Sequence, residues 1–123
     1  MLIFDTNNIT IPAPPRGTSK KEGQKYDSDK PMMNLFPLSV AESISKVLTF
    51  GAQKYEAHGW KTVPKAVERY QAALLRHMSA LQKGEEYDTD SGLPHVYHIG
   101  CNITFLIYFY NQDSTKFMED IKA

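Results

Sequence analysis

Apolar residues recur with helical spacing in the stretch that follows Pro37. At steps of three and four residues, the chain carries Leu38, Ala41, Ile44, Leu48, Ala52 and Tyr55. This spacing puts them on one face of a helix, which would turn toward a core. Ser39 and Glu42 have the spacing of a capping box, so we expect this helix to begin at Ser39. Gly51 marks either a close contact between helices or an early stop.

Two further helices follow from the same pattern. The second is predicted from Pro64, a residue suited to a first turn, to Gly84, which is typical just beyond a helix end. Its apolar face carries Val67, Tyr70, Leu74, His77 and Leu81. The third is predicted from about Leu93 to Tyr110, with Asp90 or Ser91 at its start and Pro94 in its first turn.

The second half of the third helix is apolar nearly all round. One face carries Val96, Ile99, Gly100, Ile103, Ile107 and Tyr110, and Phe105, Leu106, Tyr108 and Phe109 cover the rest. Such a helix must be buried, and a few helices cannot easily cover it. The pattern therefore predicts an all-α single domain completed by homo-oligomerisation, as a dimer or higher. A short terminal helix, capped by Ser114, should carry Phe117 and Ile121.

Length and composition set the domain organisation. A chain of 123 residues suits one domain. Residues 1–30 are rich in Pro, Gly, Ser, Thr and Lys, so we expect a flexible N-terminal arm, with the helical domain in 31–123. Within the arm, the apolar strip Met1 to Phe4 could pack against a neighbour.

Charge and cysteine content narrow the class of protein. The formal net charge is zero, which removes the basis for sequence-independent binding to nucleic acid or to an anionic membrane. Cys101 is the only cysteine, so intrachain disulfides are excluded and we interpret it as a small buried apolar residue. We see neither a secretory signal nor a run near the roughly 18 apolar residues of a membrane span. A soluble, cytoplasmic protein is expected.

The segment 76–98 concentrates polar chemistry, with three histidines and four carboxylates. His95, His98 and Asn102 are spaced by three and four, so they share one arc near the start of the third helix. Carboxylates and imidazoles together suit Mg²⁺ or Mn²⁺ better than a structural zinc. Such an ion would neutralise a polyphosphate and lower the pKa of an attacking water. The plainer interpretation is a pair of surface histidines beside a solvated acidic loop.

Other residues are candidates for metal or substrate binding. Glu85 and Asp88 would point the same way if the second helix continued by one turn. His77 lies on an apolar face and is either a hydrogen-bonded core histidine or a ligand or general base. The cations Arg76, Lys54 and Lys30 could hold phosphates, and Tyr55 and Trp60 could stack a base, although packing is the commoner role of such aromatics.

A set of short motifs along the chain resembles the phage dATP/dGTP diphosphohydrolase family. The motifs are Lys25-Tyr26-Asp27, Lys30-Pro31, Leu35-Phe36-Pro37, Gly51-Ala52-Gln53-Lys54-Tyr55, Gly59-Trp60, Arg69-Tyr70, Ala73-Leu74-Leu75-Arg76-His77, Gly84-Glu85, Asp88, Asp90-Ser91-Gly92-Leu93 and His95-x-x-His98. Together they extend from about Lys25 to Tyr110. The family is similar to the all-helical MazG-like nucleotide pyrophosphohydrolases, so the resemblance implies a MazG-like helical bundle.

The resemblance also implies an activity, which is cleavage of a purine deoxynucleoside triphosphate between the α and β phosphates with Mg²⁺ or Mn²⁺. We therefore expect a metal-dependent dGTP/dATP pyrophosphohydrolase of phage nucleotide metabolism, which would work in the host cytoplasm. The expected metal ligands are Glu85, Asp88, His95 and His98, with Glu85 and His77 as catalytic residues. Arg76, Lys54, Tyr55, Asn102, Lys30 and Trp60 are the expected substrate-binding residues. The alternatives are a catalytically silent nucleotide-binding protein and a structural helical dimerisation module.

Overall fold

The computed structural model describes residues 23, 26 and 28–122, and these residues form helices joined by loops, without a strand. An all-α fold is therefore confirmed. The chain divides into two compact units, Met1–Pro37 and Leu38–Ala123. The described part of the first unit contains one short 3-10 helix, η1 (Met33–Leu35). Most of the predicted N-terminal arm, including Met1 to Phe4, lies outside the described residues.

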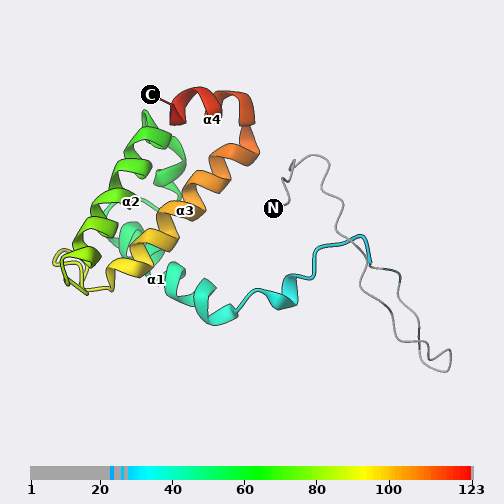
Figure 1. The fold of residues 1–123 in the computed structure, drawn as a ribbon, viewed down its shortest axis with the longest axis horizontal. Coiled ribbons are helices and arrows are strands. Elements are labelled where there is room, and N and C mark those ends of the chain that lie inside the picture. Colours follow the sequence, from blue (N-terminus) through cyan, green and yellow to red (C-terminus); the bar gives the residue numbers. More distant parts are fainter. Residues whose placement is uncertain (1–22, 24–25, 27, 123) are drawn as a thin grey trace. The chain divides into compact units, whose positions relative to one another are not determined.

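The second unit holds four α-helices and one 3-10 helix. In chain order they are α1 (Leu38–Lys54), η2 (Gly59–Thr62), α2 (Ala66–Gln82), α3 (His95–Gln112) and α4 (Ser114–Ile121). Helices α2 and α3 lie side by side and run in opposite directions (Figure 1). Since α3 also contacts α1 and α4, it is the central helix of this unit.

Aromatic packing holds η2 and α2 against the second half of α3. The Trp60 ring stacks on Phe105, with 4.4 Å between ring centroids, and meets Tyr108 edge-on at 4.8 Å. The Tyr70 hydroxyl donates a hydrogen bond of 2.8 Å to the Trp60 carbonyl, which ties α2 to η2. Burial raises the pKa of Tyr70 to about 12, so this hydroxyl stays protonated and can donate. The apolar side of α3 that bears Phe105 is thus covered within the chain.

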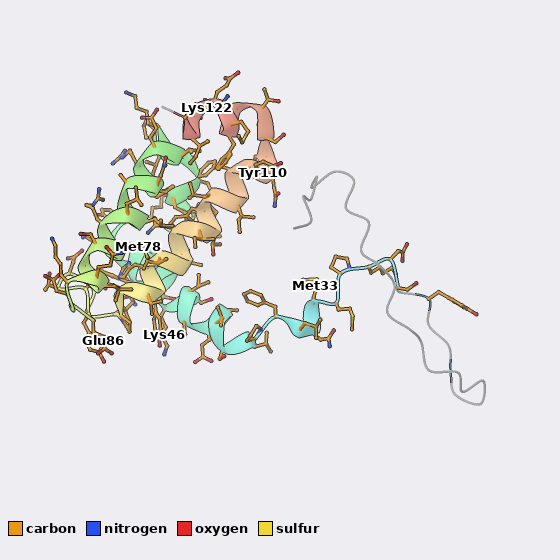
Figure 2. The ribbon with its side chains drawn as sticks, viewed as in Figure 1. Met33, Lys46, Met78, Glu86, Tyr110 and Lys122 are labelled. Carbon is orange, nitrogen blue, oxygen red and sulfur yellow. The ribbon has the colours of Figure 1, made fainter. Side chains whose placement is uncertain are left out.

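The other contacts of α3 involve α1 and α4. Helix α1 approaches α3 at Gly100, where an added Cβ would lie 3.2 Å from Ile44 Cγ1. Figure 2 shows Tyr110 near the end of α3, from which α4 continues, and its ring meets Phe117 of α4 at 5.5 Å. Cys101 is fully buried and burial raises the pKa of its thiol to about 12, which confirms its interpretation as a small buried residue.

The helix ends differ in detail from the predictions. Helix α1 begins at Leu38, so Ser39 lies inside the first turn and not at the cap position. Helix α4 is capped by Asp113, whose Oδ1 accepts a hydrogen bond of 3.0 Å from the Lys116 backbone, so the prediction of Ser114 as the cap was wrong. An aspartate carboxylate caps a helix as well as a serine hydroxyl does, and the two adjacent residues compete for one position.

Candidate functional site

The connection between α2 and α3 folds back on itself and brings its two ends together. The His95 backbone N–H donates to the Glu86 carbonyl at 2.8 Å, and the Asp88 N–H donates to the Leu93 carbonyl at 2.9 Å. Gly84 and Gly92 have φ values of +88° and +72°, a left-handed conformation that glycine adopts without steric cost. This tight turn places Asp88 against the first turn of α3.

Three side chains from different elements meet at that point. They are His77 of α2, Asp88 of the connection and His95 of α3, and one ligand atom from each lies within 4.8 Å of the others. The two imidazole Nδ1 atoms of His77 and His95 are 2.7 Å apart, so one ring donates a hydrogen bond to the other. His95 is buried, with 7% of its surface exposed, while His77 and Asp88 are partly exposed.

His98 and Ser91 border this cluster. The His98 ring stacks on His77, with 4.5 Å between centroids and an interplanar angle of 9°. Its Nε2 lies 2.7 Å from Ser91 Oγ and 3.7 Å from Asp88 Oδ2. The Ser91 backbone N–H donates to that same Asp88 oxygen at 2.8 Å. His77, His95 and His98 therefore belong to one polar group near the C-terminal end of α2 and the N-terminal end of α3.

Burial sets the protonation of the site. It lowers the pKa of His77 to about 4, helped by the neighbouring His98 and His95, and it also lowers the pKa of His98. Burial opposes ionisation of Asp88, but hydrogen bonds from Ser91 and the nearby histidines outweigh it and lower the pKa of the carboxyl. At neutral pH the site thus presents the Asp88 carboxylate with neutral imidazoles at His77 and His98, and these are the protonation states that bind metal ions.

The donor set and its spacing fit a divalent cation. All three ligand atoms lie within 4.8 Å of one another, a spacing compatible with one shared divalent cation. A ligand set of imidazole nitrogen and carboxylate oxygen suits Mn²⁺ and related transition metals. It suits Mg²⁺ less well, because Mg²⁺ prefers oxygen ligands. His77, Asp88 and His95 are therefore the residues that could hold an ion.

The predicted ligands are only partly brought together. Asp88 and His95 lie in the cluster, and His98 lies beside it with its Nε2 facing Ser91. Helix α2 ends at Gln82, so it does not extend to pair Glu85 with Asp88 on one helical face. Glu85 is exposed and lies outside the cluster.

The predicted substrate residues separate into groups. Tyr55, Trp60 and Arg76 line one cavity of about 1150 Å³ between α1, η2 and α2, together with Arg69 and Tyr70. Arg76 immediately precedes His77, so this cavity reaches the helical turn that carries the cluster.

The remaining predicted substrate residues lie elsewhere. Lys54 donates to Asp90 at 2.6 Å, and this hydrogen bond raises the lysine pKa. Asn102 is buried and donates to the His98 carbonyl at 2.8 Å. Lys30 is exposed in the first unit, Met1–Pro37.

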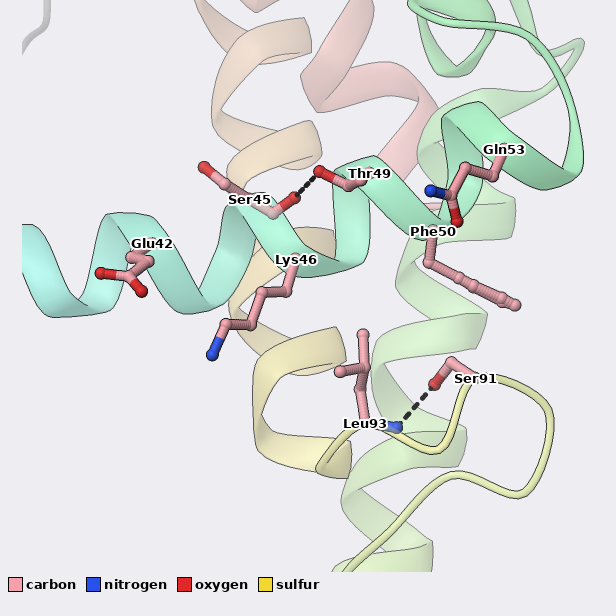
Figure 3. Close-up of a pocket in the computed structure, with 8 residues that line it drawn as sticks. All are labelled: Glu42, Ser45, Lys46, Thr49, Phe50, Gln53, Ser91 and Leu93. Carbon is pink, nitrogen blue, oxygen red and sulfur yellow. Dashed lines mark hydrogen bonds between the residues drawn. The ribbon is translucent and has the colours of Figure 1, made fainter.

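A second cavity of about 690 Å³ lies between α1 and the connection. It is lined by Glu42, Lys46, Phe50 and Gln53 among the residues of α1, and by Ser91 and Leu93 (Figure 3). Figure 3 shows the Phe50 ring pointing from α1 toward the connection. Because Ser91 also contacts His98, this cavity adjoins the polar cluster.

Ser91 was predicted as a possible helix start and belongs to one of the family motifs, but its contact with His98 was not predicted from the sequence. The sequence held a signal only for the neighbouring bond, because aspartate side chains commonly accept hydrogen bonds from backbone N–H groups a few residues further on, as Asp88 does from Ser91. Sequence reasoning also left Arg69 and Lys46 out of the candidate residues. Nothing in their spacing distinguishes them from exposed cations on a helix.

The fold and the site define a helical protein with a histidine and carboxylate cluster beside two cavities. Residues 20–120 match the family described as dATP/dGTP diphosphohydrolase, N-terminal, so the chain belongs to this family. A dATP/dGTP diphosphohydrolase of Salmonella phage PMBT28 is 30% identical over 94 residues, which are 76% of this chain and 32% of that protein. The chain thus spans about a third of the length of this relative. No solved structure matches the chain.

In the described part of the chain, no helix is both long enough and apolar enough to cross a membrane.

Proposed function

We propose that this chain hydrolyses purine deoxynucleoside triphosphates, dGTP or dATP, to the monophosphate and pyrophosphate with Mg²⁺ or Mn²⁺. The observation that carries the proposal is the cluster of His77, Asp88 and His95, whose ligand atoms lie within 4.8 Å of one another. Family membership supports a nucleotide substrate, because the relative from Salmonella phage PMBT28 is named a dATP/dGTP diphosphohydrolase.

In this proposal, His77, Asp88 and His95 hold a divalent cation. When bound, such a cation would neutralise phosphate charge and lower the pKa of a water molecule. Burial keeps His77 neutral at pH 7, and an ion bound by both imidazoles would replace the hydrogen bond between His77 Nδ1 and His95 Nδ1. Water then attacks the α phosphorus, the bond from that phosphorus to the bridging oxygen breaks, and pyrophosphate leaves. The second oxygen of the Asp88 carboxylate and the imidazole of His98, which lies beside the cluster, are the groups available to accept the proton of the water.

The larger cavity is the proposed place for the nucleotide. Its aromatic lining includes Tyr55, Trp60 and Tyr70, which offer flat apolar surface for a purine. Arg69 and Arg76 line the same cavity, and guanidinium groups bind phosphate oxygens with two parallel hydrogen bonds. Arg76 and His77 are adjacent residues of α2, so a phosphate held by Arg76 would lie at the same turn of this helix as the cluster.

The proposal is tested by incubating the purified protein with each dNTP in Mg²⁺, Mn²⁺ or EDTA and separating the products by chromatography. We expect monophosphate and pyrophosphate from dGTP or dATP only when metal is present. Diphosphate and phosphate as products would contradict the proposed bond. If no product forms while dGTP raises the melting temperature, the protein is a nucleotide-binding protein. If neither occurs, it is a structural module.

A matched pair of variants tests the cluster itself. Asp88→Asn should reduce turnover by about 100-fold or more, because even indirect partners of a metal are worth about 10- to 100-fold. Glu85→Gln removes a charge from the same connection, and we expect turnover to stay within a few-fold of wild type, since Glu85 is exposed and outside the cluster. Equal losses in both variants would return Glu85 to the ligand set.

A further inference from the structure

Ser91 makes three hydrogen bonds at the junction between the connection and α3. Its backbone N–H donates to Asp88 Oδ2 at 2.8 Å, and its Oγ lies 2.7 Å from His98 Nε2. The same Oγ accepts a hydrogen bond of 3.1 Å from the Leu93 backbone. One residue thus contacts a member of the cluster, the histidine beside it and the backbone of the turn.

A hydroxyl has one hydrogen and two lone pairs, so it can take part in several hydrogen bonds at once. The Leu93 N–H occupies one lone pair of Ser91 Oγ, and the tautomer of His98 decides which partner donates in the bond between Oγ and His98 Nε2. Asp88 Oδ2 is 3.7 Å from that nitrogen, too far for a direct hydrogen bond. Ser91 is therefore the group that links the carboxylate to the imidazole.

The link extends to a second histidine. His98 stacks on His77 at 4.5 Å with nearly parallel rings, and His77 Nδ1 is 2.7 Å from His95 Nδ1. The orientation of the His98 ring consequently limits the orientation of His77. The smaller cavity also reaches this junction, because Ser91 lines it.

We propose that Ser91 is a positioning residue of the metal site, which holds the Asp88 carboxylate through its backbone and the His98 ring through its hydroxyl. In this arrangement the ion is held by His77, Asp88 and His95, while His98 supports His77 from outside with its Nε2 bonded to Ser91. The inference rests on the metal site of the proposed function. It assigns a role to a hydroxyl that carries no charge and binds no ion.

The test is the affinity for Mn²⁺, measured by electron paramagnetic resonance of the free ion, without nucleotide. Ser91→Ala should raise the Mn²⁺ dissociation constant about tenfold or more, since outer partners of metal ligands are worth about 10- to 100-fold. Ser91→Thr retains a hydroxyl and should restore affinity to within a few-fold of wild type. Ser79→Ala, at an exposed serine of α2, is the matched control and should bind as wild type does.

The Mn²⁺ dependence of turnover is a second measurement. It distinguishes a positioning role of Ser91 from a purely structural one. In Ser91→Ala, the Mn²⁺ concentration for half-maximal dNTP hydrolysis should rise with the dissociation constant, while kcat at saturating Mn²⁺ falls much less. The melting temperature in EDTA shows whether the variant folds. Should Ser91→Ala not fold, Ser91→Cys keeps the shape with a weaker donor and should bind Mn²⁺ less tightly than wild type.

The outcomes separate the two proposals. The positioning role is overturned if Ser91→Ala binds Mn²⁺ within twofold of wild type. The same holds for Ser91→Cys when Ser91→Ala does not fold. A wild type that binds no Mn²⁺ also overturns the role. If the wild type binds Mn²⁺ but hydrolyses no dNTP, the proposed function fails, while the affinity of the Ser91 variants still decides the role of Ser91.

Discussion

At the scale of single residues, the chemistry of the site depends on contacts between elements. His95 and His98 are one turn apart on α3, and both contact His77 of α2, His95 through a hydrogen bond at Nδ1 and His98 by stacking on the ring. Helical spacing predicted that His95, His98 and Asn102 share an arc, and the arc is turned inward, since His95 and Asn102 are 7% and 6% exposed. Burial of these polar groups is sustained by their hydrogen bonds.

The burial of His77 predicts a pH dependence of stability in the metal-free protein. Its pKa is lowered from 6.5 to about 4 in the folded state, so between these values the unfolded chain binds more protons than the folded one. The free energy of unfolding should therefore be highest above about pH 6.5 and fall as the pH is lowered toward 4. Melting temperatures measured in EDTA between pH 4 and pH 6.5 test this prediction. The melting temperature of His77→Gln should fall less steeply over this pH range. Equal declines in the two proteins would contradict the assignment to His77.

At the scale of elements, the two glycines of interest have opposite surroundings. Gly51 in α1, for which a close contact or a stop was predicted, is within the helix, and a Cβ added there would meet no described atom within 4 Å. Gly100 in α3 is the close contact, because an added Cβ would lie 3.2 Å and 3.3 Å from Ile44. Both glycines occur in apolar helical patterns, and only the crossing of α1 over α3 distinguishes them.

This difference predicts opposite effects on stability. Gly100→Val should lower the free energy of unfolding by about 1–3 kcal/mol, because the added carbons overpack the contact with Ile44. Gly51→Ala should raise it by about 0.5–1 kcal/mol, since alanine is the better helix former and no contact is disturbed. Urea unfolding measures both. An unchanged Gly100→Val protein would mean that α1 does not pack against α3 in solution.

At the scale of the whole molecule, the described residues include large apolar side chains that are exposed on α3. Val96, Ile103 and Ile107 form a stripe along α3 and are 55%, 44% and 55% exposed. These residues belong to one face of the helix for which burial by homo-oligomerisation was predicted. The opposite apolar side, with Phe105 and Phe109, is the one that packs against Trp60 and Tyr70. A contiguous apolar stripe of this kind is typical of an interaction surface.

We therefore expect self-association through the α3 stripe. Sedimentation velocity should show a dimer or higher oligomer, and the double variant Ile103→Lys with Ile107→Lys should sediment as a monomer, because two charges cannot be buried there without partners. Met118→Lys changes an exposed apolar residue of a different helix, α4, and should leave the oligomer intact. A wild type that is monomeric at all concentrations would rule out this association.

The sequence by itself determined the helices, because their apolar spacing is a local property of the chain. The predicted second helix, Pro64 to Gly84, contains α2, and the predicted third helix largely coincides with α3. Boundaries moved by a few residues where neighbouring side chains compete for a cap, as Asp113 and Ser114 do. The segment that carries the histidines and Asp88 was also identified, since its composition alone is unusual.

Only the tertiary structure decided which of these groups meet. The prediction paired Asp88 with Glu85 on a continued helix, whereas the connection turns back at Gly84 and brings Asp88 to His77 and His95. It likewise decided which side of α3 is covered and that Ser91 binds Asp88 and His98. The physical reason is that these contacts join residues of separate elements, and their distances depend on loop geometry and on helix crossing, which no spacing along the chain encodes.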